Sequence, residues 1–181
     1  MKKPNVKMLI MSALMAAVIC VTAVISFKIG VIPITLALLG IFLTATMLEP
    51  KYAALSVVVY LLLGIIGVPV FSGFSSGIGV LAGPTGGYIV SYIFVALIVS
   101  IVTKRFNRNV IAMMVSMIVA IAVCYAFGTA WFLIYTKKGL AYALAACVTP
   151  FIIPDIIKGV VTCVIIKLLE KTPVFKMLYD K

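Results

Sequence analysis

The sequence contains no histidine and few acidic residues. Among 181 residues there are 4 Asp and Glu against 15 Lys and Arg, and the cysteines stand inside apolar runs without C-x-x-C spacing. A metal site with thiolate or imidazole ligands is therefore not expected, and no catalytic residue or cofactor is assigned. The cysteines are expected to pack in the core; they are Cys20, Cys124, Cys147 and Cys163.

Charged residues of either sign are scarce. They make up 10% of the chain, hydrophobic residues make up 65%, and the mean hydropathy is +1.34. A soluble domain is about half apolar and a quarter charged, so this chain is predicted to be an all-α integral membrane protein. The net charge of +11 is distributed in small groups between apolar runs. This pattern favours membrane lipid as a partner and not nucleic acid.

Six apolar runs are candidate transmembrane helices, because a spanning helix needs about 20 mostly apolar residues. They cover about 8–27, 32–48, 52–67, 87–103, 110–135 and 143–168. Pro150 and Pro154 interrupt the last run, so the final helix either begins at these prolines or is kinked and begins earlier. An uncharged glycine-rich loop covers 68–86. No repeat or linker divides the chain, and residues 1–181 are predicted to form a single six-helix membrane domain.

The basic residues predict the orientation in the cell membrane. With the N-terminus inside, eleven Lys and Arg fall in the inner segments and three, Lys28, Lys137 and Lys138, in the outer ones. Basic residues accumulate on the cytoplasmic side of membrane proteins, so both termini are predicted to be cytoplasmic in a multi-pass protein. The loop 68–86 then faces outward. The inner bases are Lys2, Lys3, Lys7, Lys51, Lys104, Arg105, Arg108, Lys167, Lys171, Lys176 and Lys181.

Two patterns in the glycine-rich loop imitate enzyme motifs. Residues 73–77 match the G-x-S-x-G of a hydrolase nucleophile elbow, with Ser75 as the serine. No histidine can act as its base, so an intramembrane serine hydrolase is a less favoured alternative. Residues 77–82 resemble half of a dinucleotide-binding fingerprint but lack its βαβ context. No P-loop sequence occurs, and the chain is not expected to be an enzyme or to hydrolyse ATP itself.

The same loop has the composition of a lid or wall over an outward-facing pocket. Glycine lets backbone N–H groups approach a ligand, and Phe71, Phe74 and Tyr88 add aromatic surface. Non-helical backbone at membrane depth persists where it is buried in protein or lines a cavity. A flexible connector is the alternative interpretation.

The segment 150-PFIIPDIIK-158 carries the strongest indication of a binding site. Asp155 and Lys158 are the only pair of opposite charges deep within a predicted span, and their i, i+3 spacing puts both on one helix face. Ionisable groups inside a bilayer usually face a bundle interior and mark a substrate or ion path. A structural ion pair between helices is the alternative.

A stripe of small residues follows the first apolar run. Ala13-x-x-x-Ala17 is continued by Ser12, Ala16 and Ala23, and small residues four apart let another helix approach closely. The partner helix is either internal or part of another subunit.

Together these features resemble the BioY family, the biotin-specific substrate-binding (S) components of energy-coupling factor (ECF) transporters. The resemblance rests on six helices, Ala13-x-x-x-Ala17, the run 83-GPTGGY-88 and the P-D-x-x-K of Pro154 to Lys158, and it extends from about residue 8 to 170. It implies a protein that captures a vitamin from outside. A separate module of a transmembrane coupling subunit and two ATPase subunits then drives uptake.

The resemblance also implies roles for individual residues. Ala13 and Ala17 would dock onto the coupling subunit. The biotin site would include Asp155, Lys158, Thr85, Gly86, Gly87, Tyr88, Phe71 and Phe74, with Trp131 as a further ring contact. Asp155 would accept a hydrogen bond from a ureido N–H and Lys158 would reach a ligand oxygen, although Lys158 on the ligand carboxylate is also compatible. Alternatives to a biotin S component are an S component or small carrier for another vitamin or small molecule, and a purely structural membrane subunit.

Overall fold

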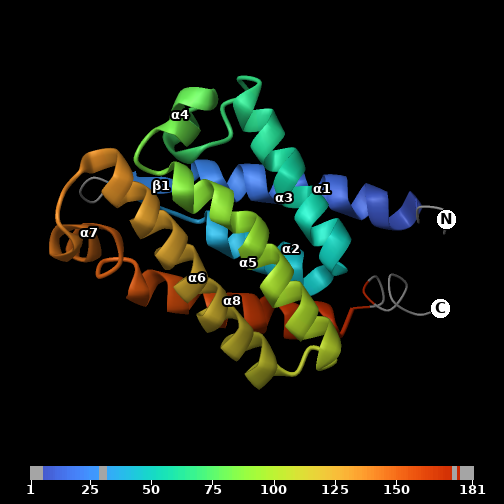
Figure 1. Ribbon diagram of the computed structural model, residues 1–181. Coiled ribbons are helices and arrows are strands. Elements are labelled where there is room, and N and C mark those ends of the chain that lie inside the picture. The colour runs from blue at the N-terminus through green and yellow to red at the C-terminus, as the bar shows by residue number, and fades with distance from the viewer. Residues whose placement is uncertain (1–5, 29–31, 173–174, 176–181) are drawn as a thin grey trace.

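The computed structural model describes residues 6–28, 32–172 and 175 (Figure 1). Four bases that entered the orientation prediction, Lys2, Lys3, Lys176 and Lys181, lie outside the described residues. In chain order the elements are α1 (Val6–Val24), β1 (Ser26–Lys28), β2 (Pro33–Thr35), α2 (Ala37–Met47), α3 (Pro50–Ile65), the 3-10 helix η1 (Ser72–Phe74), α4 (Ile78–Ala82), α5 (Gly86–Arg105), α6 (Val110–Thr136), α7 (Leu140–Cys147) and α8 (Ile152–Leu169).

The long helices follow the apolar runs. Helices α1, α5 and α6 are each long and apolar enough to cross a membrane, whereas α2 and α3 are shorter apolar helices. Their boundaries have local causes. Pro50 begins α3, where its missing N–H is not needed, and the Asn109 side chain accepts hydrogen bonds from the first backbone N–H groups of α6.

The run 32–48 differs from the helix predicted there. Its first residues form β2, which pairs antiparallel with β1 so that Phe27 lies opposite Ile34. Helix α2 begins only at Ala37, whose backbone N–H donates to the Thr35 hydroxyl. Apolarity alone does not distinguish a short strand from a helix, and for this reason the sequence pattern missed the hairpin. The helix predicted for 8–27 also ends early, because α1 stops at Val24 and β1 follows from Ser26.

The run 143–168 is divided into two helices, α7 and α8. Helix α7 ends at Cys147 and α8 begins at Ile152, with Pro150 in the break. Pro154 lies in the first turn of α8, where the backbone N–H groups have no partner within the helix. The final helix therefore begins at the prolines. The glycine-rich segment 68–86 is also partly helical, because it contains η1 and α4.

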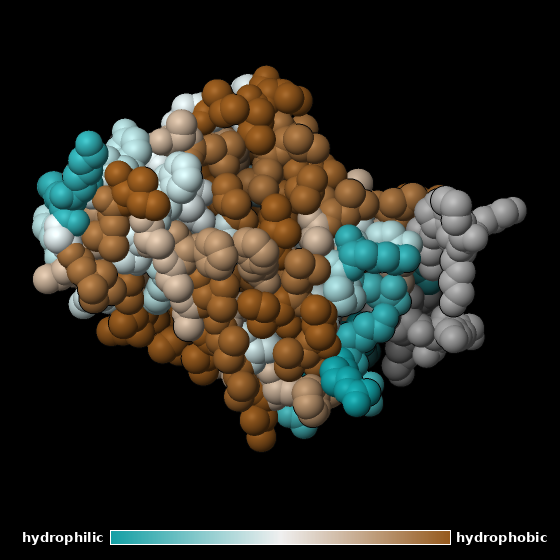
Figure 2. All heavy atoms as spheres, in the orientation of Figure 1, coloured by the Kyte–Doolittle hydropathy of each residue, from teal (hydrophilic) through white to brown (hydrophobic). Residues whose placement is uncertain are grey.

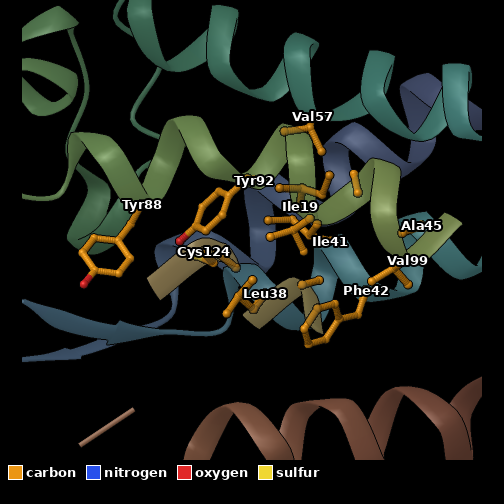
Figure 3. Packing of buried hydrophobic residues seen from close by; sticks show 14 of the residues in the cluster. Ile19, Leu38, Ile41, Phe42, Ala45, Val57, Tyr88, Tyr92, Val99 and Cys124 are labelled. Carbon is orange, nitrogen blue, oxygen red and sulfur yellow. The ribbon is translucent and has the colours of Figure 1, made fainter. Parts of the chain in front are cut away.

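The core lies between α5 and the helices around it (Figure 3). Ile19 of α1, Ile41 of α2, Val57 of α3 and Val99 of α5 are fully buried there. Burial of apolar side chains against one another fixes the relative positions of four helices.

The exterior of the bundle is strongly apolar. Figure 2 shows hydrophobic residues over the broad middle of one face and hydrophilic residues gathered at the two ends. Large side chains such as Ile10, Ile118, Ile134 and Ile157 are exposed. Exposed apolar surface of this extent is typical of a protein surrounded by lipid. Helix α1 begins and α8 ends at the same end of the molecule (Figure 1).

Candidate ligand-binding site

A cavity of about 320 Å³ lies where the short and broken elements meet. Its volume is within the range of small-molecule pockets, which starts at roughly 300 Å³. All helices except α7 contribute to its wall, together with β2. The lining residues are Ala23, Ile32, Pro33, Thr35, Ala37, Leu38, Tyr60, Ser72, Gly73, Ser75, Val80, Thr85, Tyr88, Ile89, Tyr92, Cys124, Tyr125, Phe151, Asp155 and Lys158.

The short length of α2 creates space for this cavity. Its 11 residues extend about 16 Å, roughly half of the thickness of a bilayer core. The chain before α2 is extended, and Pro33 and Thr35 line the cavity. A full-length helix in place of the hairpin would fill this volume with its own side chains.

Asp155 and Lys158 form a buried ion pair on the cavity wall. Lys158 Nζ lies 2.6 Å from Asp155 Oδ1, and the two residues are 6% and 1% exposed. Both lie in the first turns of α8, so the position of the pair in the cavity is set by the helix start at Ile152. The positive end of the helix dipole lies beside the carboxylate.

A third residue completes this polar group. The hydroxyl of Tyr125, on α6, donates to Asp155 Oδ2 at 2.7 Å. Each carboxylate oxygen thus accepts one hydrogen bond from the protein and retains a lone pair for a ligand, while the ammonium has further N–H groups to donate. The Asp155 acceptor and the Lys158 donor thus lie side by side, and their opposite charges cancel.

Aromatic side chains form much of the remaining wall. Tyr60, Tyr88 and Tyr92 line the cavity with their rings, and Figure 3 shows Tyr88 and Tyr92 projecting from α5 on the same side. The Tyr88 hydroxyl lies 3.2 Å from Thr129 Oγ1 and donates to the Cys147 carbonyl oxygen at 3.3 Å. These rings provide apolar surface next to the polar group.

The structure brings four of the sequence-predicted residues to this cavity: Asp155, Lys158, Thr85 and Tyr88. Ser75 also lines it, and its hydroxyl donates to the Ser72 carbonyl oxygen at 2.8 Å.

The two glycines predicted with them are buried but do not line the cavity. A Cβ on Gly86 would overlap the Leu81 carbonyl oxygen, and one on Gly87 would overlap the Trp131 side chain. The Trp131 indole N–H donates to the Gly83 carbonyl oxygen at 2.8 Å. In the GPTGGY run the two glycines permit close packing of α4 and α6 on the start of α5, and they position Thr85 and Tyr88 indirectly.

The two predicted phenylalanines lie elsewhere as well. Phe71 is fully buried behind the cavity, with its ring edge-on to Tyr60 at 5.6 Å between centroids. Phe74 is 71% exposed and has a left-handed backbone, with φ of 60°. Neither is among the lining residues.

Sequence reasoning did not single out Tyr125, Tyr60 or Tyr92. One signal for them was present, since each is a tyrosine in the interior of an apolar run. A phenol hydroxyl at that depth needs a hydrogen-bond partner, and several such hydroxyls indicate a polar pocket.

The small-residue motif of α1 has two faces. Ser12 and Ala16 are buried, and the Ser12 hydroxyl donates to the Tyr52 carbonyl oxygen at 3.2 Å. Ala13 and Ala17 are exposed, and they lie on the outside of the bundle. The internal packing of α1 therefore uses the first face, and the second is left uncovered within the described chain.

No group of three His, Cys, Asp or Glu residues that could hold a metal ion occurs in the part of the chain that the structure describes.

The chain is similar to known proteins over nearly its whole length. A family model described as the BioY family matches residues 1–173. Biotin transporter BioY2 of Lactococcus lactis subsp. cremoris is 34% identical over 164 residues, which cover 91% of this chain and 90% of that protein. Biotin transporter BioY of Thermotoga maritima is 34% identical over 168 residues, with coverage of 93% and 98%.

The fold also matches a solved structure. A crystal structure at 2.1 Å of the S-component for biotin from an ECF-type ABC transporter aligns with a TM-score of 0.85 and 27% identity. The alignment covers 99% of each chain.

Proposed function

Because the chain belongs to the BioY family, we propose that it is the biotin-binding S component of an ECF-type ABC transporter. The observation that carries this proposal is the group formed by Tyr125, Asp155 and Lys158 on the wall of the cavity. A buried acceptor and a buried donor next to aromatic walls suit a ligand with a polar head and an apolar body.

The charge of the ion pair indicates which end of biotin lies against it. Asp155 and Lys158 compensate each other, so a neutral group can join them without leaving net charge in the interior. A ligand carboxylate in the same position would leave one buried negative charge, which is costly in a low dielectric. The ureido group offers two N–H donors and one carbonyl acceptor. Asp155 accepts from a ureido N–H, and Lys158 donates to the ureido oxygen.

The remaining wall suits the rest of the ligand. The rings of Tyr60, Tyr88 and Tyr92 pack against the thiophane ring and the aliphatic chain. Thr85 and Ser72 add further polar residues to the wall.

The exposed alanines of α1 are the docking site for a separate transmembrane coupling subunit, which works with ATPase subunits. Ala13 and Ala17 lie next to exposed Ile10 and Leu14, so a partner helix could approach the backbone closely within an apolar surface. The chain contains no P-loop, which is consistent with an energy source on another polypeptide.

In the membrane, six segments cross the bilayer: α1, the hairpin strand β2 with α2, α3, α5, α6 and α8. Both termini are cytoplasmic. Lys104 and Arg108 line a second cavity together with Met8 near the start of α1, so these bases lie at the end where α1 begins. The ligand-binding cavity then lies toward the outer side.

Calorimetric titration of the purified protein with biotin tests this function. Saturable binding is expected, and riboflavin and thiamine serve as controls. Binding of another vitamin with no response to biotin would favour an S component of different specificity. Labelling of Ser75 by a serine-reactive probe would instead favour the hydrolase.

A further inference from the structure

Residues 71–75, between α3 and α4, form a small closed turn (Figure 1). The backbone N–H of Phe71 donates to the Ser75 carbonyl oxygen at 3.0 Å and closes the turn. Ser72, Gly73 and Ser75 line the cavity that contains the ion pair of Asp155 and Lys158. The 71–75 turn is therefore part of the wall of the proposed binding site.

Phe71 attaches this turn to the rest of the bundle. It is 0% exposed, and its ring lies edge-on to that of Tyr60 on α3. Tyr60 is 2% exposed and lines the same cavity. The other phenylalanine of the turn, Phe74, is largely exposed. The edge-on contact of Phe71 with Tyr60 therefore joins two separate parts of the cavity wall, and such pairs are favourable beyond the area that they bury.

Gly64 of α3 provides the space for the Phe71 ring. A Cβ at position 64 would overlap the far end of this ring. The Gly64 carbonyl oxygen also accepts a hydrogen bond from the backbone N–H of Gly77 at 2.7 Å. The same residue of α3 thus receives the Phe71 ring at one side of the turn and the backbone at the other.

Two glycines flank the turn and give its backbone freedom to rotate. Gly67 and Gly77 have φ of 108° and 90°, a region that residues with a side chain rarely adopt. A Cβ on either glycine would meet no atom within 4 Å, so close packing is not the reason for glycine at these positions. Residues that absorb a change in φ and ψ at both ends of a segment are typical of a hinged loop.

We propose that Phe71 is a positioning residue that slows the release of biotin. Its ring, packed at Gly64 against Tyr60, holds the 71–75 turn on the cavity wall. Phe71 does not line the cavity and acts through Tyr60 and the turn. This inference rests on the proposed function and assigns control of ligand release to a contact outside the cavity. Without the ring, the turn can rotate about Gly67 and Gly77 and open the wall.

The test measures the dissociation rate of biotin from the purified protein. F71L removes the far end of the ring and keeps an apolar side chain, and G64A puts a methyl group where that end lies. Each variant is expected to release biotin about 3-fold to 10-fold faster, the size expected when an aromatic pair is lost. The association rate is expected to change little, since the residues that line the cavity are unchanged.

The double variant G64A/F71L distinguishes packing of the ring at Gly64 from a general loss of stability. Leucine lacks the ring atoms that a methyl group at position 64 would overlap, so the double variant should release biotin more slowly than G64A alone. Independent changes would instead add. F106L is the matched control with unchanged dissociation, because Phe106 is 57% exposed at the end of α5 and outside the cavity. Additive effects, or wild-type dissociation in both single variants, would overturn the proposal.

Hydrogen exchange without ligand separates a failure of this inference from a failure of the proposed function. The backbone N–H of Gly77 is hydrogen-bonded to Gly64, so its exchange reports on the attachment of the turn. F71L should speed this exchange and F106L should not. If the wild type does not bind biotin, the proposed function is wrong and the exchange decides whether Phe71 holds the turn. If the wild type binds biotin and F71L changes neither exchange nor dissociation, Phe71 has no positioning role.

Discussion

The hydroxyl of Tyr125 lies 2.7 Å from Oδ2 of Asp155, although the two residues belong to different helices. Tyr125 is on α6, and Asp155 is in the first turn of α8. The Lys158 ammonium donates to the other carboxylate oxygen, Oδ1, at 2.6 Å. The carboxylate is thus held by contacts from two helices. In the proposed biotin site, such preorganisation reduces the entropy lost on binding.

Tyr125→Phe is expected to weaken biotin binding. The change removes one hydrogen bond to a charged group, which contributes about 1.5–3 kcal/mol, or roughly 10-fold to 100-fold in affinity. Calorimetry on the purified protein measures it. Tyr135→Phe is the control, because Tyr135 lies on the same helix and is 54% exposed. Equal affinities of the two variants would show that the phenol does not position the carboxylate.

Asp155→Asn is expected to reduce binding further than Tyr125→Phe does. It removes the proposed ureido acceptor and leaves Lys158 buried without its counter-ion, an effect of about 3–5 kcal/mol on stability when one partner of a buried pair is lost. Biotin titration and thermal unfolding are measured together.

Helix α8 offers a matched control for this variant. Lys167 and Glu170, at the other end of the helix, form an ion pair with the same i, i+3 spacing at 2.7 Å, outside the cavity. Glu170→Gln should leave binding unchanged and lower the stability by less than about 1 kcal/mol. If Asp155→Asn behaves like Glu170→Gln, the buried pair has no role in ligand binding.

Ala13→Leu and Ala17→Leu are expected to separate transport from binding. Both alanines are exposed, so a larger side chain is accommodated in the isolated chain but obstructs a docked helix. Biotin uptake by cells should fall at least about 10-fold, while titration of the purified variants gives unchanged affinity. Ala122→Leu is the control, since Ala122 is an exposed alanine on α6 with another exposed alanine, Ala126, four residues on. Full uptake in the α1 variants would exclude this face as the docking site.

Gly128→Ala is expected to disturb the aromatic wall. A Cβ at Gly128 would overlap the ring of Tyr88, which lines the cavity. Displacing the ring should lower the free energy of unfolding by about 1–3 kcal/mol and weaken biotin binding. Gly79→Ala is the comparison, because a Cβ there meets no atom within 4 Å. If Gly128→Ala has the stability and biotin affinity of the wild type, the Tyr88 ring can shift without cost and does not form a fixed wall.

Glu49→Gln is expected to change the acid dependence of stability. The hydrogen bond from Lys104 lowers the pKa of Glu49, and the positive charges of Lys104 and Lys51 also contribute. A lowered pKa in the folded state stabilises the protein above the unfolded pKa of about 4.3, and this stabilisation is lost as the pH falls through the folded pKa. The pair is partly exposed, so the gain at pH 7 should stay below about 1 kcal/mol.

Thermal unfolding from pH 7 to pH 3 measures this difference. The wild type should exceed Glu49→Gln at pH 7 and converge with it in acid. Lys104→Gln should reproduce the loss, because Glu49 then has no partner at 2.6 Å. If the difference in stability between the wild type and Glu49→Gln does not change with pH, the ion pair of Glu49 and Lys104 is not its source.

Much of this protein follows from the sequence alone. The scarcity of charge and the long apolar runs specify a helical membrane protein, because these are properties of composition that hold whatever the fold. The i, i+3 spacing of Asp155 and Lys158 puts them on one helix face, because it is a property of local geometry. The membership of the BioY family, expected from short motifs, is confirmed by the match over residues 1–173.

Only the tertiary structure decided the composition of the cavity. Tyr125 of α6 forms a hydrogen bond with Asp155 of α8, and the hairpin before α2 leaves room for the cavity beside them. No local sequence pattern encodes either arrangement. Gly86 and Gly87 share a motif with Thr85 and Tyr88, but only Thr85 and Tyr88 line the cavity. The two glycines pack against neighbouring elements instead, because the surroundings of a helix decide which of its residues face a cavity. Periodicity determines which residues share a face, and contacts between distant segments determine what that face meets.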